Sequence, residues 1–130
     1  MEKKLFGSLL EGPIIDVTTA PPMKRRIFYG DSVMTGANVL AAGILVPRHH
    51  HPEEQISYII SGTCRITTWT DESGKAAGDI PHTVEAKAGD IAWFPSNADH
   101  EILMHEECNI MDIFDIVRDS WIELAEEQGL

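Results

Sequence analysis

Short β-type segments separated by turn residues are the feature that most constrains the fold of this chain. The segments are rich in Ile, Val, Thr and aromatic residues, and Gly, Pro, Asn and Asp divide them. This pattern, with no helical periodicity between the segments, favours an antiparallel sandwich or barrel. We therefore expect an all-β fold with strands near residues 14–17, 24–29, 38–46, 55–60, 63–70, 82–87, 91–94, 100–104 and 109–117.

The ends of the chain and one internal segment depart from the strand pattern. Residues 71–81 predict a long loop, of a size that is usually functional or mobile. Near the C-terminus, apolar residues recur at helical spacing, and Asp119 or Ser120 is expected to cap this helix. We divide the chain into an N-terminal arm, a barrel and a C-terminal helical tail, at residues 1–30, 31–118 and 119–130.

Composition and charge exclude several classes of function. A chain of 130 residues with 43% hydrophobic residues predicts one folded domain. Its net charge of −11 repels phosphate backbones and anionic lipids, so we expect no nucleic-acid or membrane partner. No apolar run approaches the roughly 18 residues that a membrane span needs.

The chain start and the cysteines bear on the compartment in which the protein works. The first residues contain no apolar segment of the kind found in secretory signals. The two cysteines, Cys64 and Cys108, cannot form a dense disulfide framework and suit a reducing environment. We therefore expect a cytoplasmic protein whose partner is a small molecule or a second copy of the chain.

Three consecutive histidines are the most informative polar feature. On an extended strand His49 and His51 point to one face and His50 to the other, so two imidazoles can reach one cation. Gln55 shares their parity and can join them if the chain stays extended past Pro52. Glu54 is the rival, because a carboxylate binds divalent metals better than an amide, but it has the parity of His50. The alternative interpretation is a solvated histidine run at a strand end.

The spacing around these histidines resembles the two signature motifs of the cupin superfamily. The first motif is Gly43, five residues, His49-x-His51, three residues, Gln55, six residues and Gly62; the second is Gly89, five residues, Pro95, one residue, Asn97, two residues and His100. The family usually has Gly where Asn97 stands and Glu where Gln55 stands. Asn tolerates a positive φ better than most residues, so the turn can be kept.

The resemblance implies a cupin jelly-roll barrel that holds one divalent transition metal in its mouth. The implied ligands are His49, His51, Gln55 and His100, and the metal could be nickel, iron, zinc or manganese. This ligand set is neutral, so the metal would keep its full charge for Lewis-acid work on an oxygen atom. Single-domain cupins also pair as dimers, often by exchange of an N-terminal strand. The resemblance therefore implies a homodimer, to which residues 1–30 could contribute that strand.

The last predicted strand supplies a second group of candidate residues. Asp112, Phe114 and Arg118 share parity, and Asp112 lies within an apolar run where a carboxylate needs a partner or a task. Burial would raise the pKa of Asp112 and a nearby arginine would lower it, and the sequence leaves both outcomes open. The alternative is an alternating strand whose polar side faces solvent.

Together with the His-x-His-Pro-x-x-Gln segment, these residues resemble the single-domain cupins of pectin and alginate breakdown, which linearise unsaturated uronates. The resemblance implies that Asp112, Phe114 and Arg118 form the catalytic side of the site. Arg118 would hold a substrate carboxylate, and Asp112 would move a proton. The favoured function is an isomerase or lyase for a carboxylated sugar or enol acid. An iron-dependent oxygenase and a non-catalytic binding module are the alternatives.

Overall fold

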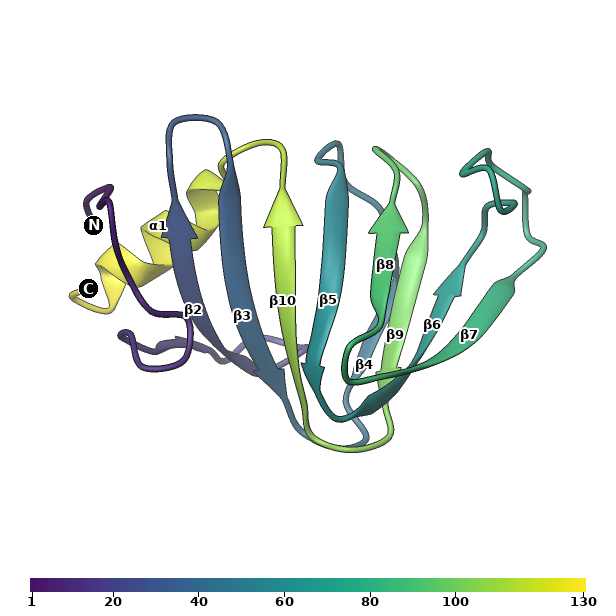
Figure 1. Cartoon of the computed structure of the whole chain (residues 1–130), viewed down its shortest axis with the longest axis horizontal. Coiled ribbons are helices and arrows are strands. Elements are labelled where there is room, and N and C mark those ends of the chain that lie inside the picture. The colour runs from purple at the N-terminus through teal and green to yellow at the C-terminus, as the bar shows by residue number, and fades with distance from the viewer.

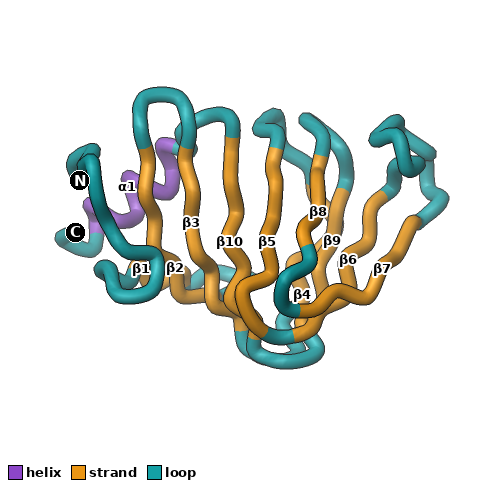
Figure 2. The backbone as a smooth tube through the Cα atoms, viewed as in Figure 1, coloured by secondary structure: helices purple, strands orange, loops and turns teal.

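Two antiparallel sheets face each other in the computed structural model, which describes residues 1–130 (Figures 1 and 2). The six-stranded sheet has the order β1-β2-β3-β10-β5-β8 and the four-stranded sheet the order β4-β9-β6-β7. The elements are β1 (Ile15–Val17), β2 (Met23–Tyr29), β3 (Met34–Leu40), β4 (Leu45–His49), β5 (Gln55–Ser61), β6 (Thr63–Thr68), β7 (His82–Lys87), β8 (Ile91–Phe94), β9 (His100–Met104), β10 (Cys108–Phe114) and α1 (Asp119–Glu127). The predicted all-β jelly-roll class with a short C-terminal helix is confirmed.

The predicted strand over 38–46 is wrong, because this region forms parts of two strands in different sheets. β3 ends at Leu40 and β4 begins at Leu45. Between them Gly43 has a φ of 83°, a conformation that glycine adopts without steric cost. The turn carries the chain from the six-stranded sheet to the four-stranded sheet and so begins to close the barrel.

The end of the barrel also differs from the expected pattern. β10 stops at Phe114, so Arg118 is not part of that strand and the parity argument for it is wrong. The helix is present, but it begins at Asp119, and Arg118 occupies the N-cap position with no side-chain cap hydrogen bond. The expected cap at Asp119 or Ser120 is therefore wrong as well, since both residues already lie inside the helix.

Strands from the first 30 residues extend the six-stranded sheet of their own chain. β1 pairs with β2, and β2 pairs with β3 in a register that sets Arg25 opposite Asn38. The division of the chain into arm, barrel and tail, and the exchange of a strand in a dimer, remain predictions. No helix of the structure has the length and apolar character that a membrane span requires.

Cross-strand register places the polar candidates on facing walls of the barrel. In the four-stranded sheet His49 of β4 lies opposite His100 of β9. In the six-stranded sheet Gln55 lies opposite Phe114, and Ser57 lies opposite Asp112. The space between these walls, above a buried apolar core, is where a site can form. That core consists of Leu40, Ile59, Cys64, Ile66, Ala86, Phe94, Ile102, Met104, Cys108 and Ile110.

Helix α1 covers one end of the six-stranded sheet, against β2 and β3 (Figure 1). Trp121 packs with Met34 and Phe114 in a second buried cluster. Its ring meets that of Phe114 edge to face, with centroids 5.1 Å apart. The helix therefore supports Phe114, one of the candidate site residues.

Candidate metal centre

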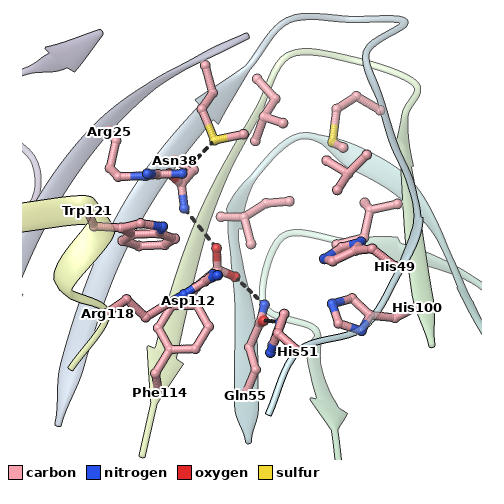
Figure 3. Close-up of a pocket in the computed structure, with 16 residues that line it drawn as sticks. Arg25, Asn38, His49, His51, Gln55, His100, Asp112, Phe114, Arg118 and Trp121 are labelled. Carbon is pink, nitrogen blue, oxygen red and sulfur yellow. Dashed lines mark hydrogen bonds between the residues drawn. The ribbon is translucent and has the colours of Figure 1, made fainter. Parts of the chain in front are cut away.

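A cavity of about 120 Å³ lies between the two sheets and contains every candidate site residue (Figure 3). Histidines occupy one wall, and an acid–arginine group with two aromatic rings occupies the other (Figure 3). The lining residues are Met23, Arg25, Asn38, Leu40, Val46, His49, His51, Gln55, His100, Ile102, Met104, Ile110, Asp112, Phe114, Arg118 and Trp121. Arg118 reaches this cavity from the N-cap of α1 rather than from a strand face.

Three histidines converge from separate parts of the chain. Each of His49, His51 and His100 offers a ring nitrogen, and these nitrogens all lie within 4.8 Å of one another. The ring of His100 stacks on Phe94 at a centroid distance of 4.2 Å and an interplanar angle of 13°. This stacking holds the buried ring in place and leaves its edge facing the cavity.

Backbone carbonyls set the same tautomer in all three rings. The acceptors are the carbonyls of Pro47, Glu53 and Ala98, which lie 2.8, 2.9 and 2.9 Å from the Nδ1 atoms of His49, His51 and His100. A carbonyl can only accept, so each Nδ1 carries the proton and each Nε2 presents a lone pair. This is the arrangement by which outer hydrogen bonds orient histidine ligands of metals.

Burial favours the neutral form of two of these rings. Desolvation lowers the pKa of His100 to about 4, and desolvation together with the charge of Arg118 lowers the pKa of His51. Neutral imidazole is the form that binds metal.

The amide of Gln55 is oriented by its neighbours on β5 and β10. Its Nε2 donates to Ser57 Oγ at 2.9 Å and to Asp112 Oδ1 at 3.1 Å. The amide oxygen is thereby turned toward His51, with Oε1 3.0 Å from Nε2 of that ring (Figure 3). Because both atoms are acceptors, a cation bound to both would resolve their repulsion.

Glu54, the rival of Gln55, and the neighbouring His50 both point away from the cavity. Glu54 is exposed, and its Oε2 accepts a hydrogen bond from Trp93 Nε1 at 2.9 Å. His50 is also exposed and lies 2.9 Å from Asp99 Oδ1. The structure thus brings together His49, His51, Gln55 and His100 and excludes Glu54 from the group.

Asp112 lies at the centre of the opposite wall and accepts three hydrogen bonds. The donors to its carboxylate are Ser57 at 2.7 Å, Asn38 at 2.8 Å and Gln55 at 3.1 Å. Burial raises the pKa of Asp112, and this effect outweighs the hydrogen bonds and the charge of Arg25, which lower it. Of the two effects that the sequence left open, desolvation is therefore the larger.

Arg118 and Phe114 complete this wall. The guanidinium of Arg118 lies 5.1 Å from the ring centroid of Phe114 and 5.2 Å from that of Trp121. Its buried Nε lies 3.6 Å from Glu53 Oε1, too far for a hydrogen bond, and has no acceptor in the protein. A buried charged donor without an acceptor is costly, so this N–H is suited to an anionic ligand.

Several residues of the site were missed by sequence reasoning. Ser57 and Asn38 both contact Asp112. The parity of Ser57 with Gln55 could have placed it on the same face, and it is a polar residue in an apolar strand. Arg25 and Trp121 come from segments that the pattern assigned to the arm and tail. No local signal connects them to the cavity.

Comparison with known proteins identifies the family. The family model described as "Cupin domain" matches residues 36–114, which is more than half of the chain. The chain is a cupin. No curated protein matches it.

Several solved cupin structures resemble this cupin in fold. An RmlC-like cupin from Shewanella frigidimarina has a TM-score of 0.73 and 18% identity, with 92% of this chain and 96% of that chain covered. KdgF from Halomonas sp. has a TM-score of 0.69 and 19% identity, with coverage of 85% and 94%. A variant of oxalate decarboxylase from Bacillus subtilis has a TM-score of 0.69 and 19% identity, and covers 92% of this chain, which spans 32% of that larger protein. At these identities the likeness establishes the fold alone.

Proposed function

We propose that this cupin is a metal-dependent isomerase or lyase that acts on a carboxylated sugar or a related enol acid. The proposal combines the site geometry with the resemblance of the His-x-His-Pro-x-x-Gln segment, Asp112, Phe114 and Arg118 to the uronate-linearising cupins. The observation that carries it is the arrangement of two facing walls. One side of the cavity presents three imidazoles and the Gln55 amide oxygen, and the other presents an acid and an arginine whose Nε has no hydrogen-bond acceptor.

The donor set fits one divalent transition metal, such as nickel, iron, zinc or manganese. Three imidazole Nε2 atoms and the Gln55 oxygen would hold it, and the metal would polarise a substrate oxygen as a Lewis acid. The ligands carry no charge of their own, so they would leave the attraction between the metal and an anionic substrate undiminished.

Arg118 is the proposed carboxylate-binding residue. Its buried Nε has no hydrogen-bond acceptor, although Glu53 lies 3.6 Å away as an ion-pair partner, and the rings of Phe114 and Trp121 hold the guanidinium at the cavity wall. A planar guanidinium can bind a carboxylate through two parallel hydrogen bonds, which would fix the orientation of the substrate. Phe114 would then act by packing against both the guanidinium and the bound molecule.

Asp112 is the proposed proton-transfer residue. Its raised pKa lies closer to neutrality than that of an exposed aspartate, so the carboxyl can both take up and return a proton. Three donors hold the group in one orientation. In an isomerisation Asp112 would remove a proton from one substrate atom and deliver it to another, with no net change in the protein.

Elemental analysis together with a substrate screen tests this proposal. The protein is purified without nickel resin, its metal content is measured, and uronates and keto acids are screened by liquid chromatography coupled to mass spectrometry, which separates isomers of equal mass. We expect about one metal ion per chain. We also expect one of the acids to be converted, either to an isomer of the same mass or to the fragments of a cleaved molecule. Asp112→Ala is expected to retain the metal and lose conversion by at least about 100-fold.

Two outcomes would replace the proposal with another function. Bound iron with substrate-dependent oxygen uptake would identify an oxygenase. Ligand binding without conversion, with Asp112→Asn changing only affinity, would identify a binding module.

We also propose that the protein is cytoplasmic and forms a homodimer. The molecular mass measured by sedimentation tests the oligomeric state.

A further inference from the structure

Arg25 is a buried cation that the proposed reaction does not use. Arg25 is only 8% exposed, and it lines the cavity beside Asn38 (Figure 3). Burial lowers the pKa of its guanidinium to about 10, so the group remains charged at neutral pH. Removing a full charge from water is unfavourable unless the charge finds partners, so each contact of this guanidinium has to be accounted for.

The protein supplies strong hydrogen-bond acceptors to only some of the N–H groups of this guanidinium. Nε donates to Asn38 Oδ1 at 2.8 Å, and one face stacks on the Trp121 ring at 3.6 Å from its centroid. Nη2 has only the Met23 sulfur, a weak acceptor, at 3.4 Å. Asp112 is reached through Asn38 and not by direct contact. The two Nη atoms, which form the outer edge of the guanidinium, therefore lack a strong hydrogen-bond acceptor within the protein.

A structural role explains the face and Nε of Arg25 but not this edge. Stacking on Trp121 would anchor α1, and the hydrogen bond to Asn38 would support Asp112. Neither contact employs the Nη donors. A guanidinium carries five N–H donors in one plane, and these two contacts use only one of them. The Nη–H donors that remain are of the kind that bind an oxyanion through paired hydrogen bonds.

Arg25 and Arg118 lie on either side of Trp121 (Figure 3). The charged residues at the cavity are these two arginines, Asp112, and Glu53, whose Oε1 lies 3.6 Å from Arg118 Nε. The two carboxylates offset the charge of the two arginines, but neither accepts a hydrogen bond from Arg118 Nε or from the Nη atoms of Arg25. An anionic ligand with suitable oxygens can supply the acceptors that these donors lack.

We propose that Arg25 is a second anion-binding residue of the cavity and that the natural ligand carries two acidic groups, one for Arg25 and one for Arg118. The proposal rests on the proposed function only in taking this cavity as the substrate site. Within the proposed class of acids it selects doubly charged members over singly charged ones. Arg25 would thus determine specificity, in addition to supporting Asp112.

Calorimetric binding of a matched pair of probes tests the proposal. Succinate carries two carboxylates and monomethyl succinate one, at nearly equal size. The metal-containing protein is expected to bind succinate at least about tenfold more tightly than the monoester. A ratio near one in the wild-type protein would overturn the proposal, whether or not any variant folds.

Arg25→Gln separates ligand binding from a purely structural role. Because one guanidinium is lost, we expect the succinate-to-monoester ratio to fall to about one, while metal content and the circular dichroism spectrum are retained. Arg65→Gln is the matched control, since Arg65 is exposed on β6 and pairs with Glu85, and it should leave the ratio unchanged. Equal weakening of both probes by Arg25→Gln would contradict the proposal and assign Arg25 a structural role.

This experiment is independent of the test of the proposed function. Failure to convert uronates or keto acids leaves the binding ratio unaffected, because the ratio requires no turnover. Conversely, if the protein shows no preference for succinate over its monoester, the proposed metal ligands and the proposed role of Asp112 are unaffected.

Discussion

At the scale of single residues, the site depends on the direction of one amide. Gln55 would be ambiguous as a metal ligand if its oxygen and nitrogen could exchange places. Ser57 and Asp112 remove the ambiguity, because both accept from the nitrogen and leave the oxygen facing His51. Ser57 also donates to Asp112, so one hydroxyl links the metal-facing amide to the proposed proton-transfer group. A glutamate at position 55 would place two carboxylates in contact here.

Ser57→Ala should therefore weaken metal binding although Ser57 is not a proposed ligand. Loss of an orienting partner typically costs about tenfold or more in affinity. Loss of one of three donors to a buried carboxylate should also lower the free energy of unfolding by about 1–3 kcal/mol. Competition with a chelator measures the first effect and urea denaturation the second. Ser61→Ala, at the exposed end of β5, is the control, and equal metal affinity in both variants would contradict the prediction.

A second prediction at this scale concerns Cys64. Burial raises the pKa of its thiol to about 12, compared with the ordinary value of 9.0. We expect Cys64 to resist iodoacetamide at about pH 8 in the native protein and to react readily in urea. Above about pH 9 the unfolded chain loses this proton while the folded one keeps it, so this group lowers stability as pH rises from 9.0 toward 12. Rapid native alkylation, detected by peptide mass, would show that the thiol is accessible.

At the scale of elements, α1 is fitted closely against β3. Gly36 provides the space, because a Cβ atom there would lie 2.6 Å from Trp121 Cζ3. Trp121 in turn contacts Phe114 and the guanidinium of Arg25, which both line the cavity. The position of α1 is thus coupled to the wall of the site through Trp121.

Gly36→Ala should displace α1 and destabilise the fold. The overlap with the Trp121 ring cannot be relieved without moving the helix, and overpacking of this kind costs about 1–3 kcal/mol. Urea denaturation monitored by tryptophan fluorescence reports both stability and the environment of Trp121. Gly30→Ala provides the control, since a Cβ there would meet only Val33 Cγ2 at 3.9 Å. Identical midpoints for the two variants would refute tight packing at Gly36.

At the scale of the whole molecule, the candidate metal ligands come from both sheets. His49 and His100 belong to the four-stranded sheet, and Gln55 begins β5 of the six-stranded sheet. A metal bound by all of them would act as a clip across the mouth of the barrel. Binding to the folded state alone would then appear as added stability of the entire fold.

Removal of the metal should consequently lower the thermal midpoint. At free metal about 100 times the dissociation constant, binding contributes about 2.7 kcal/mol, which is roughly 10 °C for a domain of this size. Differential scanning calorimetry with and without a chelator measures the change. His49→Ala should unfold at one temperature in both conditions. A thermal midpoint of the wild-type protein that changes neither with chelator nor with added metal would argue against a metal that bridges the sheets.

The sequence by itself determined the class of fold and the spacing of the candidate ligands. The motif spacing grouped His49, His51, Gln55 and His100, and these residues do meet at the cavity. The alternation argument for His51 and Gln55 holds less well, because β4 ends at His49 and the chain is not a strand again until Gln55. The turn at Asn97 is a local property, and its positive φ of 61° is confirmed. Local pattern was less reliable where strands end, as the continuous strand over 38–46 and the position of Arg118 show.

Only the tertiary structure decided what surrounds the acid. Asp112 meets Asn38 from β3 and Ser57 from β5, and its burial sets the direction of its pKa shift. Arg25 and Trp121 lie far from Asp112 along the chain, and no periodicity relates them to it. Hydrogen bonding and desolvation depend on distances between strands, which arise only when the sheet register and the packing of α1 are set.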